Sequence, residues 1–247
     1  MPKWCPAKVV AKKVWTDGLF TLSIQSKDVQ SFEPGQFLHL ALGDEENRVN
    51  RPYSVASPHG DTIEFFIVVV EDGELTPRLS QLNEGDDVTV SERAAGSFTL
   101  KKTPEAEILW LVSTGTGLAP YIAMLRTETP WQRFEKIVVI HGVRYAADLA
   151  YTDELKSLEE KYDSRFKLVQ SLTREEKPGT LHGRIPNLLE DGTLEEHLGW
   201  TMNKDNSAVL LCGNPAMLDD MEERLGKREM TKHRTKSPGQ IVLERYW

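Results

Sequence analysis

The chain has 247 residues, a net charge of −8, 39% hydrophobic residues and 28% charged residues, a balance typical of water-soluble globular proteins. The negative net charge argues against nucleic-acid binding as a main role, because there is no global basic field to displace counterions from phosphates. Its two cysteines have no CxxC spacing and indicate neither a disulfide framework nor a zinc or iron–sulfur site, so any redox centre must be a bound molecule.

Membrane insertion is not expected. The longest apolar runs, 63–70 and 108–112, are far shorter than the roughly 20 residues of a spanning helix. The first ten residues lack the apolar core of a secretion signal. We therefore expect a cytoplasmic protein, and we also expect a monomer.

Residues 7 to about 100 consist of short β-like runs separated by turn signals such as Asp17-Gly18 and Asp72-Gly73. The expected strands are 7–15, 19–26, 36–42, 51–57, 62–70 and 86–93. This spacing predicts a small antiparallel β-barrel or sandwich.

Arg51-Pro52-Tyr53-Ser54 lies on one of these strands, where alternation sends Arg51 and Tyr53 to one side and Ser54 to the other. A guanidinium can bind a pyrophosphate through two hydrogen bonds, an aromatic ring can stack on a planar ring, and a hydroxyl can reach a ring nitrogen. Taken alone, the four residues also fit a purely structural strand.

One short helix is expected over 76–82, with Thr76 as N-cap and Pro77 at the first helical position. The preceding Gly73 and Glu74 place free backbone N–H groups where an anion can bind. A plain helix cap would have the same sequence. With Arg51, this helix start predicts the two sides of a pyrophosphate site.

Beyond residue 102 strands alternate with helices, which predicts a parallel sheet covered by helices on both faces. The expected strands are 108–113, 136–144, 166–174 and 207–213, and the expected helices start near Ala119 and Pro215 or span 149–162 and 185–189. The fold class is therefore a two-domain protein, with an antiparallel β-barrel over 1–101 and an α/β nucleotide-binding domain over 102–247.

The second domain contains two strand-to-helix turns with recognisable motifs. Residues 113–120, STGTGLAP, let the backbone approach phosphates at a helix start, although the run does not match GxGxxG and alone indicates only a nucleotide or sugar phosphate. In the second turn, Asn214 is the expected N-cap and Pro215 the first helical residue. Cys212 is interpreted as a small buried hydrophobic residue and not as a nucleophile.

Together these motifs resemble the plant-type ferredoxin-NADP reductase superfamily. RPYS, GELT, GTGLAP, CGNPAM and a terminal ERYW occur in the family's order and approximate spacing, over essentially the whole chain. HGVRYAADLAY, LHGRIP, MTKH and the final Tyr-Trp are most similar to the bacterial ferredoxin/flavodoxin-NADP reductases. The resemblance implies a barrel that binds FAD noncovalently and an α/β domain that binds NADP(H).

For FAD, the resemblance implies that Arg51 and the Glu74-Leu75-Thr76 backbone hold the pyrophosphate, with Tyr53 on the isoalloxazine and Ser54 near flavin N5. Trp247 is expected on the adenine and Tyr246 over the flavin face, although a terminal Tyr-Trp could also be a surface tail. The other expected FAD contacts are Pro52, Phe66, Ile67, Val68 and Thr116.

For NADP(H), the resemblance points to Arg144, Arg174 and Arg184, at or beyond strand ends on the carboxyl edge of the sheet. Guanidinium groups suit a 2′-phosphate, whereas an NAD site favours an acidic residue at the ribose. Each arginine alone could be an ordinary surface charge. The other expected NADP contacts are Thr173, Cys212, Gly213 and Asn214.

The implied reaction is hydride transfer between nicotinamide and flavin N5, coupled to single-electron exchange with a protein partner. By the resemblance, Ser54, Cys212, Glu244 and Tyr246 lie near the reacting atoms, while Trp247 departs from the plant pattern. The rival functions are a flavin or quinone reductase, the reductase component of an oxygenase, and a non-enzymatic FAD-binding regulatory module. FAD binding without NADPH diaphorase activity would favour the last.

The expected partner is an acidic ferredoxin or flavodoxin, steered by basic side chains on an otherwise acidic protein. An alternative is that these cations only form a solvated face. The docking candidates are Lys227, Arg228, Lys232, Arg234 and Lys236, with Lys8, Lys12 and Lys13.

Overall fold

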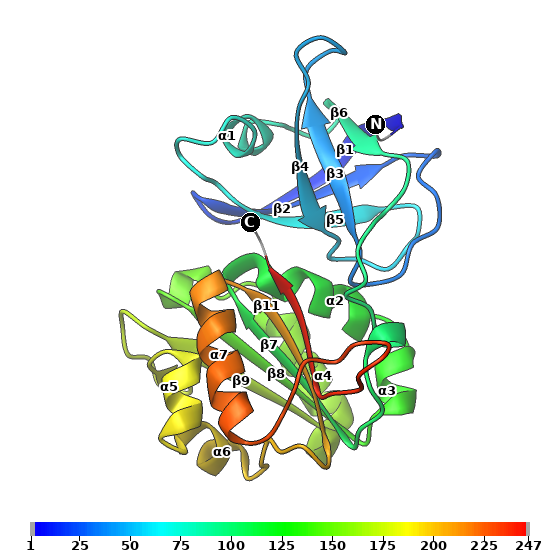
Figure 1. Cartoon of the computed structure of the whole chain (residues 1–247). Helices are drawn as coiled ribbons and strands as arrows, with labels where there is room; N and C mark the ends of the chain where they lie inside the picture. The colour runs from blue at the N-terminus through cyan, green and yellow to red at the C-terminus, as the bar shows by residue number, and fades with distance from the viewer. Residues whose placement is uncertain (1–2, 246–247) are drawn as a thin grey trace. The chain divides into compact units, whose positions relative to one another are not determined.

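The computed structural model describes residues 3–245, which belong to two compact units (Figure 1). The first comprises Met1–Leu100 with Ala119–Thr127, and the second Lys101–Leu118 with Glu128–Trp247. The strand pattern predicted a single boundary between residues 101 and 102. The inclusion of 119–127 in the first unit rests on packing, since Ala123 belongs to that unit's buried core.

The first unit is built on a six-stranded antiparallel sheet in the order β4-β3-β6-β1-β2-β5. An additional bridge between Val55 and Phe65 brings the two ends of the sheet together, as in a barrel. Its strands are β1 (Trp4–Thr16), β2 (Leu19–Gln25), β3 (Phe37–Leu42), β4 (Val49–Ser54), β5 (Ile63–Val68) and β6 (Asp87–Ser91). All six expected strands are confirmed.

The short helix of this unit, α1 (Thr76–Ser80), shows that the predicted N-cap was wrong. Leu75 occupies the cap position, and Thr76 is the first helical residue. The Thr76 hydroxyl instead accepts a hydrogen bond from the Val70 N–H at 2.8 Å. The Val70 N–H thus takes the hydroxyl oxygen that a helix cap would use. The Thr76 side chain therefore fixes the loop between β5 and α1.

The second unit is built on a six-stranded parallel sheet in the order β10-β9-β8-β7-β11-β12. Its strands are β7 (Ile108–Thr114), β8 (Lys136–Val143), β9 (Phe166–Leu172), β10 (Leu181–His182), β11 (Ser207–Gly213) and β12 (Ile241–Arg245). The predicted parallel sheet is confirmed. The two outer strands, β10 and β12, were not among the predicted strands.

The remaining helices are α2 (Ala119–Leu125), α3 (Thr129–Arg133), α4 (Thr152–Tyr162), α5 (Ile185–Glu190), α6 (Thr193–Leu198) and α7 (Pro215–Lys227). The Asn214 side chain accepts from the Ala216 N–H at 2.9 Å, so the predicted cap of α7 is confirmed. Helix α4 begins three residues later than predicted. A 3-10 turn over Ala146–Asp148 and a left-handed Tyr151, with φ of 58°, come before it.

The core of the second unit explains its runs of apolar residues. Strands β7, β8 and β11 lie in the middle of the sheet and are buried on both faces, as expected for a parallel sheet. Trp110 on β7 is fully buried, and its indole N–H donates to the Ser207 hydroxyl at 3.1 Å. Among residues 3–245, no helix is long and apolar enough to cross a membrane.

Candidate functional site

In the first unit, the structure brings Arg51 on β4 together with the segment that leads into α1. One guanidinium nitrogen, Nη2, lies 3.1 Å from the carboxylate of Glu74, and Nη1 donates to the Asn50 carbonyl at 2.7 Å. Both side chains of the ion pair are exposed. Arg51 therefore lies close to the start of α1, as predicted, and the anion that it contacts in this structure is the Glu74 carboxylate.

Tyr53 and Ser54, on the same strand, differ in burial as alternation requires. Arg51 is exposed and Ser54 is buried, whereas Tyr53 is half-buried and packs edge-on against Phe65, with ring centroids 6.5 Å apart. Burial raises the pKa of Tyr53 to about 12, and the nearby Arg51 lowers it only partly. The phenol therefore stays protonated at neutral pH and offers an aromatic surface, not an acid or base.

Strand β5 carries the next group of predicted cofactor contacts. It is the last strand in the sheet order, and Phe66 and Ile67 are buried while Val68 is 40% exposed. Val70, just beyond the strand, is also exposed. An edge backbone beside exposed apolar side chains fits a flat heterocycle, which needs both polar contacts and an apolar surface.

In the second unit, the two strand-to-helix turns interlock at the carboxyl edge of the parallel sheet. A Cβ on Gly117 would lie 2.4 Å from the Cys212 carbonyl oxygen, and one on Gly213 would lie 2.4 Å from the Thr114 hydroxyl. The same hydroxyl accepts from the Asn214 N–H at 2.9 Å. Only glycines permit this approach, which leaves backbone without side chains where a phosphate can come close.

The three candidate NADP arginines occupy consecutive positions on this edge. Arg144 follows β8, Arg174 follows β9, and Arg184 lies between β10 and α5. The Arg174 N–H donates to the Arg144 carbonyl at 3.0 Å, which joins the first two turns directly. Thr173 is held in the same junction, because its N–H and hydroxyl contact the Val143 carbonyl.

All three of these guanidinium groups are on exposed residues. Within residues 3–245, none of the three forms an ion pair with a carboxylate. Unpaired cations at the carboxyl ends of parallel strands are what a phosphorylated ligand requires.

Cys212 and Glu244 are also brought together. They are register partners on the neighbouring strands β11 and β12, and Ser113 is the partner of Cys212 on the other side. Cys212 is fully buried and Glu244 half-buried, so the expected burial of the cysteine is confirmed. Ser54 belongs to the other unit, and Tyr246 and Trp247 lie outside the described residues.

The sequence analysis missed His141, a fully buried histidine on β8. Its Nε2 lies 3.0 Å from the carbonyl oxygen of Gly115, in the 3-10 turn Gly115–Leu118 that follows β7. The signal that could have found it is a histidine within the otherwise apolar strand KIVVIHGV.

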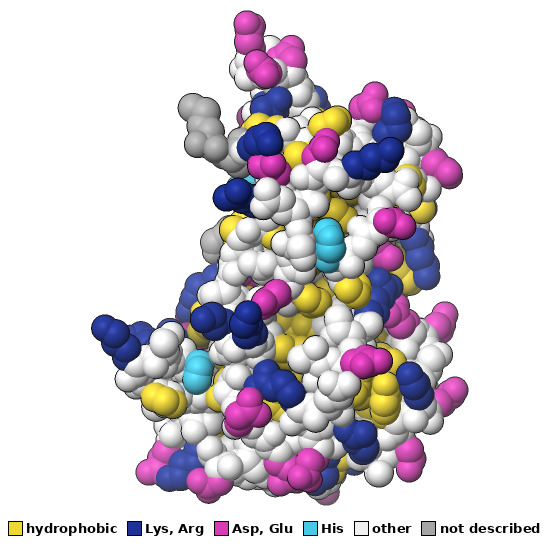
Figure 2. All heavy atoms as spheres, turned by 90° about the vertical axis from the view of Figure 1, so that its right-hand side faces the viewer, with side chains coloured by type: hydrophobic (Ala, Val, Ile, Leu, Met, Phe, Trp, Pro, Cys, Tyr) yellow, Lys and Arg dark blue, Asp and Glu magenta, His cyan; other side chains and the backbone are white. Residues whose placement is uncertain are grey.

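The candidate docking cations are largely engaged within their own unit. Lys227 lies 3.1 Å from Glu223, Lys232 lies 2.8 Å from Glu222, and Arg228 lies 2.5 Å from Glu195. Lys8 pairs with Asp87, Lys12 donates to the Ser80 and Leu82 carbonyls, and Lys13 lies 3.8 Å from the centre of the Trp15 ring. Arg234 and Lys236 have no ion pair within residues 3–245. On the face shown in Figure 2, cations and anions are interspersed.

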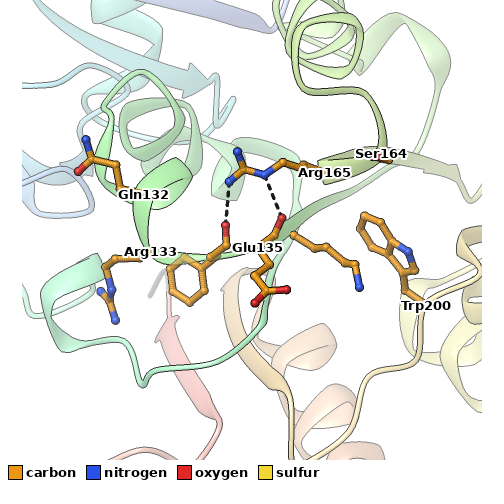
Figure 3. A pocket seen from close by; sticks show the side chains of 8 residues that line it. Gln132, Arg133, Glu135, Ser164, Arg165 and Trp200 are labelled. Carbon is orange, nitrogen blue, oxygen red and sulfur yellow. Dashed lines mark hydrogen bonds between the residues drawn. The ribbon is translucent and has the colours of Figure 1, made fainter.

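A pocket of about 740 Å³ lies at the opposite, amino-terminal edge of the parallel sheet (Figure 3). It is lined by charged, polar and aromatic side chains: Gln132, Arg133, Phe134, Glu135, Lys136, Ser164, Arg165 and Trp200. Its cations already have partners. Arg165 donates to the carbonyls of Trp131, Phe134 and Glu135, and Lys136 lies 2.7 Å from Glu107. Within the described chain, the carboxyl edge is therefore the better candidate for ligand binding.

The sequence matches two family models, an oxidoreductase FAD-binding domain over residues 7–98 and an oxidoreductase NAD-binding domain over residues 111–223. The crystal structure of a ferredoxin NADP+ reductase from Neisseria gonorrhoeae with bound FAD and NADP is similar, with a TM-score of 0.93, 30% identity and 99% of each chain covered. Fold and site thus define a two-domain flavin- and nicotinamide-dependent oxidoreductase.

Curated relatives give a narrower family. The flavodoxin/ferredoxin--NADP reductase of Escherichia coli (strain K12) is 43% identical over the full length of both chains. The ferredoxin--NADP reductase of Azotobacter vinelandii is 34% identical, over 96% of this chain and 95% of that protein. The chain belongs to the flavodoxin/ferredoxin-NADP reductase family.

Proposed function

We propose that this protein is an enzyme that transfers electrons between NADP(H) and a ferredoxin or flavodoxin through noncovalently bound FAD, in the cytoplasm. Family membership supports the reaction. The observation that carries the choice of NADP(H) is the row of three exposed arginines, Arg144, Arg174 and Arg184, which have no carboxylate partner within residues 3–245.

For FAD, we assign the pyrophosphate to Arg51 and the backbone at the start of α1, and the isoalloxazine to Tyr53, Ser54 and the edge of β5. Three observations support this fit: the contact of Arg51 with Glu74, the half-buried Tyr53 ring, and the exposed Val68. We assign a further FAD contact to Thr116. Bound FAD supplies the exchange between a two-electron and a one-electron carrier, and the chain supplies orientation.

For NADP(H), we assign the phosphates to the arginines and to the interlocked glycine turns. Cys212 and Glu244, adjacent at the end of the sheet, are assigned to the nicotinamide. The buried Cys212 limits the space open to the ring and keeps water away from it, whereas the half-buried Glu244 supplies a polar contact. No side chain has to act as a nucleophile in this arrangement.

For the protein partner, we assign docking chiefly to Arg234 and Lys236. They are exposed and lack ion pairs among the described residues, so they can interact with an acidic surface without first losing an internal partner. The neighbouring cations that form ion pairs contribute only to the overall electrostatic potential of the surface.

The test is an absorbance spectrum of the purified protein, followed by anaerobic titration with NADPH and separately with NADH. We expect flavin bands that bleach at much lower NADPH than NADH concentration. Bleaching by NADH alone would contradict the arginine assignment and keep the family, while a protein that cannot be loaded with FAD would contradict the proposed function. Reduction of a ferredoxin or flavodoxin, compared with free flavin and quinone, then separates the acceptor classes.

A further inference from the structure

We propose that His141 is a positioning residue for NADP(H): its imidazole N–H holds the carbonyl of Gly115 and thereby keeps the glycine-rich turn in its ligand-binding shape. The inference rests on the proposed role of this turn in NADP(H) binding. His141 itself is fully buried and is not expected to touch the ligand.

The geometry assigns the direction of this hydrogen bond. A carbonyl oxygen can only accept, so Nε2, 3.0 Å from the Gly115 oxygen, must carry the proton. The other ring nitrogen, Nδ1, is buried and has no partner within the described chain. The neutral tautomer protonated at Nε2 is the form in which the ring has its partner and leaves no buried N–H unsatisfied.

The electrostatics keep His141 in this form over the working pH range. Burial lowers the pKa of His141 to about 4, an effect that the Gly115 carbonyl only partly offsets. The residue is therefore a fixed donor near neutral pH and not a proton shuttle. This behaviour suits a support for the backbone and does not suit a general acid or base.

The turn needs such a support on the β8 side. Gly115 has a φ of +53°, a left-handed conformation that glycine tolerates but does not by itself enforce. On the β11 side, the backbone of Gly117 packs closely against Cys212, and that of Gly213 against Thr114. The Asn214 N–H also donates to the Thr114 hydroxyl. On the other side of β7, His141 is the register partner of Ser113 and reaches back to Gly115. The turn is thus fixed from both neighbouring strands.

Two substitutions separate a positioning role from simple filling of space. His141→Leu fills the site but removes the donor and leaves the Gly115 carbonyl without it. His141→Gln keeps an N–H donor the same number of bonds from Cβ as Nε2, whereas His141→Asn is too short to reach. Ser171→Ala is the matched control, because it removes a buried hydroxyl on the adjacent β9 that has no partner within the described chain.

The experiment measures NADP+ dissociation constants by calorimetry on FAD-loaded protein, with KM and kcat for NADPH using ferricyanide as acceptor. We expect His141→Leu and His141→Asn to weaken NADP+ binding and raise the NADPH KM about tenfold, as for loss of one buried hydrogen bond. FAD content and kcat at saturating NADPH should change little. For His141→Gln, the NADP+ dissociation constant and the NADPH KM should lie within about threefold of the native values. For Ser171→Ala, both should equal the native values.

Binding by His141→Leu within about twofold of the native protein would overturn the inference, as would a His141→Gln variant as weak as His141→Leu. Native protein that holds FAD but does not bind NADP+ would instead overturn the proposed function. Nuclear magnetic resonance of the native imidazole nitrogens gives a test that does not depend on the variants folding. The neutral Nε2–H form between pH 6 and 8 is expected, and an Nδ1–H form or an imidazolium there would contradict the inference.

Discussion

Two basic regions of the second unit differ in what their charges contact. At the carboxyl edge of the parallel sheet, Arg144, Arg174 and Arg184 are exposed and lack carboxylate partners within the described chain. In the segment from Lys227 to Lys236, three of five cations form ion pairs with glutamates from α5, α6 and α7. The density of positive charge in the sequence is therefore a poor guide to which cations are available to a ligand.

The difference has a physical cause. Arg144 and Arg174 directly follow strands, and Arg184 precedes α5. Within residues 3–245, no carboxylate forms an ion pair with any of the three. The C-terminal segment instead begins on α7, whose own turns present Asp219, Glu222 and Glu223 to nearby cations. An internal carboxylate lowers the gain from binding an external anion, because that first pair must be broken.

The largest effect is expected for the unpaired edge. Arg144→Ala with Arg174→Ala should raise the KM for NADPH about 100-fold, since each loses a charge-assisted hydrogen bond to phosphate. The KM for NADH should change less than about threefold. Steady-state kinetics with both nucleotides measures the two KM values and their ratio in the native protein and in the variant.

The matched control removes two cations from the other region. Lys227→Ala with Lys232→Ala changes net charge equally but should leave the NADPH KM within about twofold. If NADPH and NADH kinetics deteriorate equally in the edge variant, the arginines do not read the 2′-phosphate.

The next effect is on stability and concerns Arg228. Its guanidinium pairs with Glu195 at 2.5 Å and also donates to the Met202 and Leu189 carbonyls. Arg228→Ala removes the guanidinium donor from these partly buried acceptors, and we expect the free energy of unfolding to fall by about 2 kcal/mol. Urea denaturation of the FAD-loaded protein measures this change.

Lys227→Ala is the control for Arg228. Its ion pairs are exposed, so Lys227→Ala should lower the free energy of unfolding much less than Arg228→Ala does. NADP+ affinity should be unchanged in both variants. Equal stability of the two variants would show that the contacts of Arg228 contribute no more to the free energy of unfolding than those of Lys227.

Most of the fold could be predicted from the sequence because the signals for its main strands are local. Alternation over β1 to β6 and the apolar runs of β7, β8, β9 and β11 predicted strands in the right places, and parallel topology then put Arg144, Arg174 and Arg184 on one edge. The Asn214 cap could be predicted because it satisfies an N–H two residues away.

Other features depend on partners distant in sequence and could not be predicted. Arg228 meets Glu195 across 33 positions, and His141 meets Gly115 across 26. The Thr76 error has a different, local origin: the Val70 N–H, six residues away, donates to the hydroxyl that the capping rule assigned to the helix. Short two-residue β10 carries too little pattern to be recognised.

A smaller effect is expected for the two unpaired cations of the C-terminal segment. Arg234→Ala with Lys236→Ala should slow reduction of a ferredoxin or flavodoxin about threefold at low salt, with the difference disappearing at high salt. Ferricyanide reduction should be unchanged. The double variant of Lys227 and Lys232 again serves as control, because it loses the same net charge; equal slowing in both would mean that only the overall field matters.

The smallest effect tests whether pairing always makes a cation unavailable. Arg51 is assigned to a cofactor although it pairs with Glu74, but both side chains are more than half exposed, at 55% and 70%, so the pair is weak and a phosphate can displace it. Glu74→Gln should therefore tighten FAD binding about two- to fivefold, measured by fluorescence titration of the apoprotein. Glu71→Gln, an exposed glutamate nearby, should leave the dissociation constant unchanged. Weaker FAD binding by Glu74→Gln would show instead that the carboxylate orients Arg51 for the phosphate. The ion pair would then preorganise this cation for its ligand.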